Sequence, residues 1–249
     1  MSDHKANHDD HHPEAIRRRL GRTQQHSYAG DAVLGGIDGA VTTFAVVAGA
    51  TGAALSPLVI VIMGFANLVA DGFSMAVSNY HNTRTRDELV ERARAKEEHH
   101  VATVPEGERE EIRQIFAAKG FEGDTLERIV DTITDDQRLW VDTMIREEYG
   151  LALEGPDPLR AGLVTFAAFA AAGLIPLLSY LVPGIQADTS FVLSCIATGL
   201  AFFIIGWLKG VHVGVPRLRA ALQTLFTGAI AASLAFAIGW LLKLSLGNG

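Results

Sequence analysis

The chain has 249 residues, of which 49% are hydrophobic and 20% are charged, and its formal net charge is −7. This composition is too apolar for a typical soluble domain and too charged for a chain that lies wholly within a membrane. The negative net charge argues against nucleic-acid binding, and the single cysteine, Cys195, excludes an internal disulfide framework.

Charge is segregated along the chain and divides it into four regions. Residues 1–28 form a polar tail rich in His and Asp, and residues 29–82 hold two apolar stretches. Residues 83–156 form a charged insert, and residues 157–249 hold three further apolar stretches. We therefore expect a membrane part that is interrupted by one soluble insert.

The N-terminal tail carries side chains that bind metal ions well. They are His4, His8, His11 and His12, together with Asp9 and Asp10. A His-rich tract of this kind favours metal binding. The alternative is a disordered tail without such a role.

Five apolar stretches are each long enough to cross about 30 Å of hydrocarbon. They cover residues 32–55, 57–77, 161–182, 189–208 and 220–242. We therefore predict an all-α, polytopic membrane protein with five transmembrane helices and a helical insert between the second and the third.

Basic residues mark every second connection between these stretches. They are Arg17, Arg18, Arg19 and Arg22 before the first stretch, Arg84, Arg86, Arg92, Arg94 and Lys96 after the second, and Lys209, Arg217 and Arg219 between the fourth and the fifth. Cytoplasmic loops are enriched in Lys and Arg. We therefore expect the N-terminus and the insert in the cytoplasm and the C-terminus on the other side.

Two acids lie inside the predicted membrane part. Between residues 32 and 77 the only ionisable side chains are those of Asp38 and Asp71. A carboxylate in hydrocarbon is costly, so an intramembrane acid by default indicates an ion or proton pathway. The alternative for each acid is a structural hydrogen bond to a neighbouring helix.

Further candidate ligands share helix faces with these two acids. Asn67, Asp71 and Met75 are spaced four residues apart, and Thr42 follows Asp38 by four residues. Hard carboxylates combined with a soft thioether suit a borderline divalent transition metal better than Ca²⁺ or Mg²⁺. The alternative for Met75 alone is lipid contact or packing.

The insert begins as a continuation of the second apolar stretch. There is no Gly or Pro between Phe73 and Val104, so one helix can run from Pro57 to about residue 99. The sequence then breaks at Val104 and Pro105. Three more helices are predicted: residues 106–118, a helix that Asp124 or Thr125 caps, and a helix from Asp135 or Asp136 to Gly150.

Three pairs of potential metal ligands lie at helical spacing in the insert. They are Glu97 with His100, Glu108 with Glu111, and Met144 with Glu148. Each pair points one way from its helix, so three helices can converge on one metal site. The alternative is that these side chains are solvated charges on helix faces.

Several sequence strings resemble the vacuolar iron transporter family. They are Gly35–Gly39 (GGIDG) and Ala70–Met75 (ADGFSM) in the first two stretches, Pro105–Glu108 and Asp142–Gly150 in the insert, and Gly173–Leu177 in the third stretch. The resemblance covers roughly residues 26–245 and keeps the motifs in order.

The resemblance implies five spans per subunit, a homodimer and a cytoplasmic metal-binding domain between spans two and three. Members of this family export cytosolic Fe²⁺, and often Mn²⁺, in exchange for protons. By position, the resemblance implies that Asp38 and Met75 are pathway residues. It also implies that the ligands of the insert are Glu97, Glu108, Glu111, Met144 and Glu148.

The chain departs from the family pattern at three positions. His100 stands where a Glu is usual, Ile145 where a second Met is usual, and Asn67 where many relatives have Glu. The first two changes alter the charge and softness of the insert. The third suggests that the proton-carrying acid has moved to Asp71.

Our hypothesis from the sequence is a proton-coupled exporter of cytosolic Fe²⁺ that serves metal homeostasis and detoxification. Mn²⁺ and Zn²⁺ are further candidate ions, and neither an organic cofactor nor enzyme activity is expected. The alternatives are a membrane-tethered ferroxidase and a metal sensor, both of which would use the insert. We expect the inner membrane of a bacterium, with a vacuolar or other endomembrane as the alternative.

Overall fold

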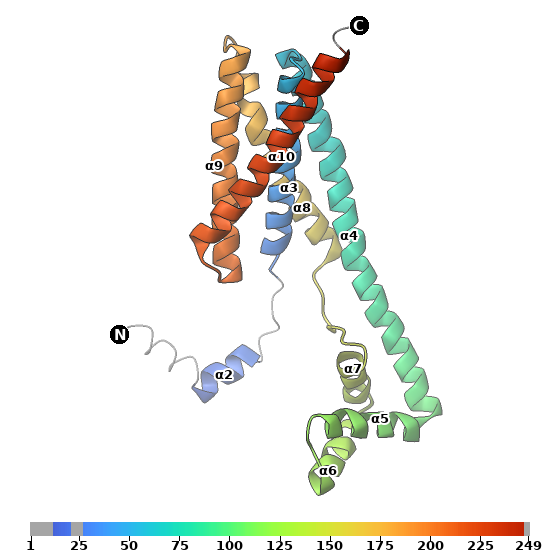
Figure 1. The fold of residues 1–249 in the computed structure, drawn as a ribbon. Helices are drawn as coiled ribbons and strands as arrows, with labels where there is room; N and C mark the ends of the chain where they lie inside the picture. Colours follow the sequence, from blue (N-terminus) through green and yellow to red (C-terminus); the bar gives the residue numbers. More distant parts are fainter. Residues whose placement is uncertain (1–11, 21–26, 247–249) are drawn as a thin grey trace.

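The computed structural model describes residues 12–20 and 27–246, and these residues are helical with no strand (Figure 1). Of the potential metal ligands in the tail, His12 lies within these residues, whereas His4, His8, Asp9, Asp10 and His11 lie outside them. The elements are α2 (Pro13–Leu20), α3 (Ala29–Gly52), α4 (Pro57–Thr103), α5 (Pro105–Ala118), α6 (Gly123–Thr134), α7 (Gln137–Glu147), α8 (Pro158–Leu174), the 3₁₀-helix η1 (Ile175–Leu181), α9 (Ala187–Val213) and α10 (Arg217–Leu246).

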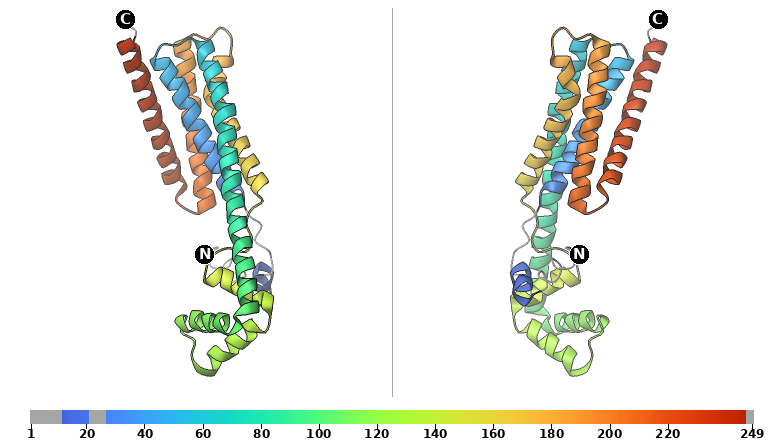
Figure 2. Two further views of the ribbon diagram at one scale, coloured as in Figure 1. Left: turned by 90° about the vertical axis from the view of Figure 1, so that its right-hand side faces the viewer. Right: turned by 90° about the vertical axis from the view of Figure 1, so that its left-hand side faces the viewer.

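Five helical segments are long and apolar enough to cross a membrane, as the sequence predicts. They are α3, the first half of α4, α8 with η1, α9 and α10. Figures 1 and 2 show these segments as one bundle, with the insert at the far end of α4. α10 ends at the opposite end of the bundle from the insert, as an odd number of spans requires. The protein is therefore an integral membrane protein of the all-α class.

Glycines let α3 approach α8 closely. A Cβ atom at Gly35 would lie 2.2 Å from the carbonyl oxygen of Thr165, and one at Gly39 would lie 2.2 Å from that of Phe169. No side chain fits in so short a gap, so the Gly-x-x-x-Gly pair brings the two backbones into contact. This contact fixes the helix that carries Asp38.

α10 packs against two different helices along its length. Near the insert, Ala221 of α10 lies against Gly206 of α9, and near the other end Gly239 lies against Gly49 of α3. The helix therefore crosses the bundle diagonally, as Figure 1 shows. Its outward flank has no neighbouring helix over most of its length.

The third span is not one continuous α-helix. The α-helical part ends at Leu174, and a 3₁₀-helix follows from Ile175 to Leu181. The break occurs because Pro176 has no N–H to donate. The backbone carbonyl of Pro176 accepts a hydrogen bond from Ser194 Oγ of α9 at 2.7 Å, which satisfies it inside the membrane.

The continuous helix predicted from the second stretch into the insert is confirmed. α4 has 47 residues and is therefore about 70 Å long. Ser56 caps its start by accepting a hydrogen bond from the N–H of Val59, and Pro57 occupies its first turn. It ends at Thr103, because Val104 precedes Pro105 and leaves the helical conformation.

Three short helices fold against the distal end of α4 and build the insert. Their apolar faces form a core that includes Ile112, Val130 and Trp140. A second cluster joins Ala93 of α4 to Ile145 of α7.

The caps of these helices match the sequence expectation in one case and differ in another. Asp136 caps α7, because its carboxylate accepts from the N–H groups of Arg138 and Leu139. The expected cap of α6 by Asp124 or Thr125 is wrong. That helix begins earlier, at Gly123, whose φ of +56° suits glycine, and Glu122 precedes it without a side-chain cap bond.

Candidate functional site

The two predicted pathway acids lie on adjacent helices in the membrane bundle. Asp38 is half-buried on α3, and Asp71 is exposed on α4 in the single chain. Asn67, one turn before Asp71, bonds Thr42, one turn after Asp38, and the two helices run in opposite directions, so both acids lie on the same side of this contact. The seam between α3 and α4 therefore carries two acids at one level of the membrane.

Polar side chains next to these acids join the two helices. The side-chain amide of Asn67 donates to the hydroxyls of Thr42 and Thr43, at 3.2 Å in each case. Thr42 donates in turn to the backbone carbonyl of Asp38 at 2.9 Å. Because the amide hydrogens of Asn67 are used by α3, its carbonyl oxygen remains as a possible cation ligand.

Met75 lies one helical turn beyond Asp71 on α4. Its side chain is partly buried and packs against the apolar core of the membrane bundle. The structure thus places all five predicted pathway residues on α3 and α4, with Met75 at the edge of the core.

A further polar cluster lies between these acids and the insert. The side-chain amide of Asn79 is 2.8 Å from Asp31 Oδ1 and 2.8 Å from Thr165 Oγ1. It therefore links α3, α4 and α8. The signal in the sequence is modest: Asn79 follows Met75 by four residues and so extends the same helix face.

In the insert, the structure brings Glu97, His100 and Glu108 together. Their potential ligand atoms all lie within 4.8 Å of one another. His100 Nδ1 is 2.9 Å from Glu108 Oε1 and 3.9 Å from Glu97 Oε1. The side chains of Glu97 and Glu108 are only 1% and 3% exposed, whereas that of His100 is 34% exposed.

This group has the chemistry of a metal site. Glu97 Oε2 and Glu108 Oε2 are buried, and among the described residues neither has a hydrogen-bond partner. Unpartnered buried carboxylate oxygens are strongly unfavourable, and a divalent cation placed between them would satisfy both. Two carboxylates and an imidazole also suit a divalent transition metal.

Burial and mutual repulsion alter the acidity of this group. Burial, a hydrogen bond to Glu97 and the charges of Glu97 and Glu111 together raise the pKa of Glu108 to about 7. Glu108 therefore keeps part of its protonation near neutral pH when no metal is bound.

The other three predicted ligands of the insert occupy two different environments. Glu111 and Glu148 are exposed. Partial loss of hydration at its carboxyl group, followed by the charges of Glu97 and Glu111, raises the pKa of Glu148. This carboxyl therefore belongs electrostatically to the same group. Met144 is fully buried in the apolar core beside Ile112.

Two residues that the sequence did not identify as part of the site, Tyr149 and Lys96, hold Glu97 in place. The Tyr149 hydroxyl donates to Glu97 Oε1 at 2.6 Å, and Lys96 Nζ donates to the Tyr149 oxygen at 2.7 Å. Their only signal in the sequence is adjacency, because Lys96 precedes Glu97 and Tyr149 follows Glu148.

Comparison with known proteins gives a consistent result. The model of the VIT family matches residues 29–240. A vacuolar iron transporter of Toxoplasma gondii is 34% identical over 229 residues, which are 88% of this chain and 76% of that protein. Vacuolar iron transporter 1 of Arabidopsis thaliana is 35% identical over 224 residues, 87% of this chain and 88% of that protein. These matches confirm the resemblance seen in the motifs, and this chain belongs to the VIT family.

Proposed function

We propose that this protein moves Fe²⁺, and also Mn²⁺, out of the cytoplasm across a membrane in exchange for protons. The observation that carries the proposal is the pair of acids, Asp38 and Asp71, which lie at one level of the α3–α4 seam. The relatives are named vacuolar iron transporters, which supports metal transport in general. Removal of cytosolic metal would serve homeostasis and detoxification.

The proposed exchange follows from the chemistry of carboxyl groups in a medium of low dielectric. There a carboxyl holds a proton readily, whereas a bound divalent cation favours the deprotonated form. Asp38 and Asp71 would then carry either protons or metal, but not both. Asn67 and Thr42 would supply neutral oxygen ligands, and Met75 a soft one.

In this proposal the insert gathers metal from the cytoplasm. Glu97, His100 and Glu108 would bind the ion, with Glu111 and Glu148 adding negative charge around it. Fe²⁺ is the first candidate ion, and Mn²⁺ and Zn²⁺ fit the same donor set. The ion is cargo, and the proposal requires no organic cofactor and no catalysis.

A homodimer would complete the pathway. Asp71 is exposed in the single chain, and an exposed acid at membrane depth is unfavourable unless another protein surface or water covers it. A second copy that packs on this face of α4 would enclose the seam.

The names of the relatives refer to a vacuole, which favours an endomembrane over the inner membrane of a bacterium.

Flux measurements in proteoliposomes test the proposal. The full chain is reconstituted into vesicles with an acidic lumen, and Fe²⁺ uptake is followed with and without the pH gradient. Asp38→Asn should abolish gradient-driven uptake, and Glu14→Gln, in the N-terminal helix α2, serves as the matched control. Normal uptake by Asp38→Asn would refute the proposed exchange.

The Glu97–His100–Glu108 group also makes a ferroxidase a second candidate. That activity would consume oxygen when Fe²⁺ is added to the detergent-solubilised full chain and would be lost in Glu108→Gln. Flux without oxygen consumption supports the transporter, whereas oxygen consumption without flux supports the enzyme. Metal binding with neither activity would indicate the sensor.

A further inference from the structure

The C-terminal quarter of the chain holds basic side chains that have no acidic partner. Residues 189–249 contain Lys209, Arg217, Arg219 and Lys243 and not one Asp or Glu. Within residues 27–246 none of these four forms an ion pair. Three of them lie around the turn from α9 to α10, at the end of the bundle that faces the insert (Figure 1).

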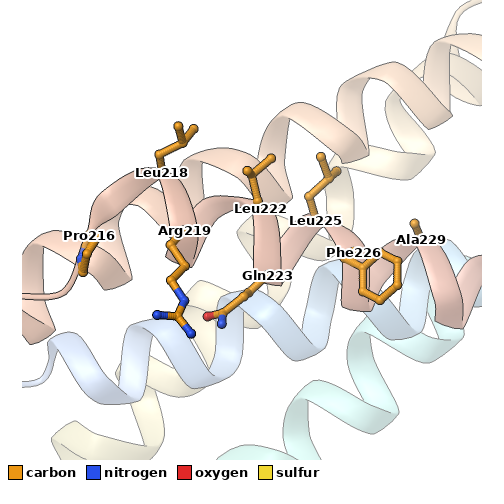
Figure 3. A pocket seen from close by; sticks show the side chains of 8 residues that line it. All are labelled: Pro216, Leu218, Arg219, Leu222, Gln223, Leu225, Phe226 and Ala229. Atoms are coloured by element: carbon orange, nitrogen blue, oxygen red, sulfur yellow. The ribbon is translucent and has the colours of Figure 1, made fainter.

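A groove of about 930 Å³ runs along the outward flank of α10 from this basic turn. One end is lined by Arg219 and Gln223, whose side chains lie next to each other on the same side of the helix (Figure 3). The rest is apolar and includes Leu222, Phe226 and Ala229. The groove therefore has a cationic end and a long apolar wall.

The groove lies next to a second apolar pocket on the same helix. Leu225 and Ala229 line both the groove and an apolar cavity of about 480 Å³ between α3, α9 and α10. The aromatic rings of Phe44, Phe191 and Phe236 also line this cavity. Water is not stable in an apolar space of this kind, whereas hydrocarbon is.

The dimensions match one leaflet of a bilayer. Ten residues separate Arg219 from Ala229, which corresponds to about 15 Å along the helix, or half of the hydrocarbon thickness. Arg219 thus lies at headgroup level when the apolar wall lies among the acyl chains. A ligand that fits has an anion at one end and a hydrocarbon chain at the other.

We propose that this groove binds an anionic phospholipid of the leaflet that faces the insert. The phosphate pairs with Arg219, assisted by the amide of Gln223, and one acyl chain lies along the apolar wall towards Ala229. Basic side chains between helices at a membrane surface recognise lipid headgroups in this way. The site lies apart from the α3–α4 seam and does not depend on which ion is transported.

Native mass spectrometry of the full chain in detergent tests the proposal, with phosphatidylglycerol and phosphatidylcholine added in turn. Wild-type protein should retain phosphatidylglycerol in preference. Arg219→Gln should weaken this binding about fivefold, because a basic group contributes about 1 kcal/mol at an anionic membrane surface. Lys243→Gln, at the other end of the same helix, should have no effect.

Two further variants separate the parts of the site. Ala229→Phe, which narrows both spaces, should weaken phosphatidylglycerol binding with Arg219 intact. Arg219→Lys should restore binding and shows that the fold is retained. An equal loss in Lys243→Gln, or full displacement of the lipid by glycerol phosphate, would overturn the proposal. A change of oligomeric state in Arg219→Gln would overturn it as well, because the groove would then face a second copy.

Discussion

At the scale of single residues, the most consequential feature is the proton that Glu108 holds beside Glu97. The pKa of Glu108 is raised from 4.5 to about 7, so the folded insert binds this proton more tightly than the unfolded chain does. The stabilisation is therefore complete below about pH 4.5 and is lost as the pH rises towards about 7. The raised pKa of Glu148 acts in the same direction.

We expect the metal-free insert to unfold at a lower temperature at pH 7.5 than at pH 5. Trp140, which is buried in the core of the insert, reports its unfolding by fluorescence once Trp207 and Trp240 are replaced by Phe. Addition of Mn²⁺ should restore stability at pH 7.5, because a cation binds the deprotonated pair. In Glu108→Gln the dependence on pH should become shallower, and an unchanged dependence would show that Glu108 does not hold the proton.

Tyr149→Phe tests the positioning of Glu97. The substitution removes the hydrogen bond that orients Glu97 Oε1, and loss of such a partner behind a metal ligand weakens metal affinity about 10-fold or more. Tyr80→Phe, which removes a tyrosine hydroxyl from α4 outside the site, is the control. Mn²⁺ titration of both variants, followed by the fluorescence of Trp140, measures the effect. Equal affinities in the two variants would show that Tyr149 plays no part in the site.

At the scale of elements, the long helix α4 and its end could be predicted because their causes are local. Pro105 acts on its own neighbour, and no helix breaker lies between the membrane and Val104. The break before Pro176 could not be placed in the same way. The carbonyl of Pro176 itself is satisfied by Ser194, a residue of α9 that lies 18 positions away, and no pattern within an apolar stretch reports that contact.

The same distinction between local and distant causes applies to the candidate site. The spacing of Glu97 and His100 is local and follows from the helical period. That Glu108 meets them depends on how α5 turns back against α4, and that Tyr149 reaches Glu97 depends on where α7 ends. These are properties of packing between helices and leave no periodic signal in the sequence.

Helix contact in the membrane yields a matched pair of variants. A Cβ atom at Gly39 would lie 2.2 Å from the backbone oxygen of Phe169, whereas one at Gly36 would meet its nearest neighbour, a side chain, at 3.6 Å. Gly39→Ala should therefore destabilise the bundle by about 1–3 kcal/mol through overpacking, and Gly36→Ala should be close to wild type. The fraction that remains monodisperse after heating measures both, and equal losses would contradict the close α3–α8 contact.

At the scale of the whole molecule, α4 connects two sites that lie far apart. Twenty-two residues separate Met75 from Glu97 along one continuous helix, so the two sites are about 33 Å apart. An ion bound in the insert cannot touch the membrane acids at the same time. In the proposed transport, such an ion would have to be released before it could reach the seam.

This separation predicts different kinetic effects for the two sites. Glu97→Gln combined with Glu108→Gln should raise the KM for Fe²⁺ flux and leave the maximal rate within about twofold, because at saturating metal the seam fills without help from the insert. Asp38→Asn should abolish gradient-driven flux at every metal concentration, saturating metal included. Initial rates in proteoliposomes over a range of Fe²⁺ concentrations distinguish the two effects. If the insert variant lowers the maximal rate as strongly as Asp38→Asn does, the ion passes obligatorily through the insert, and α4 must then bend or move to bring the two sites together.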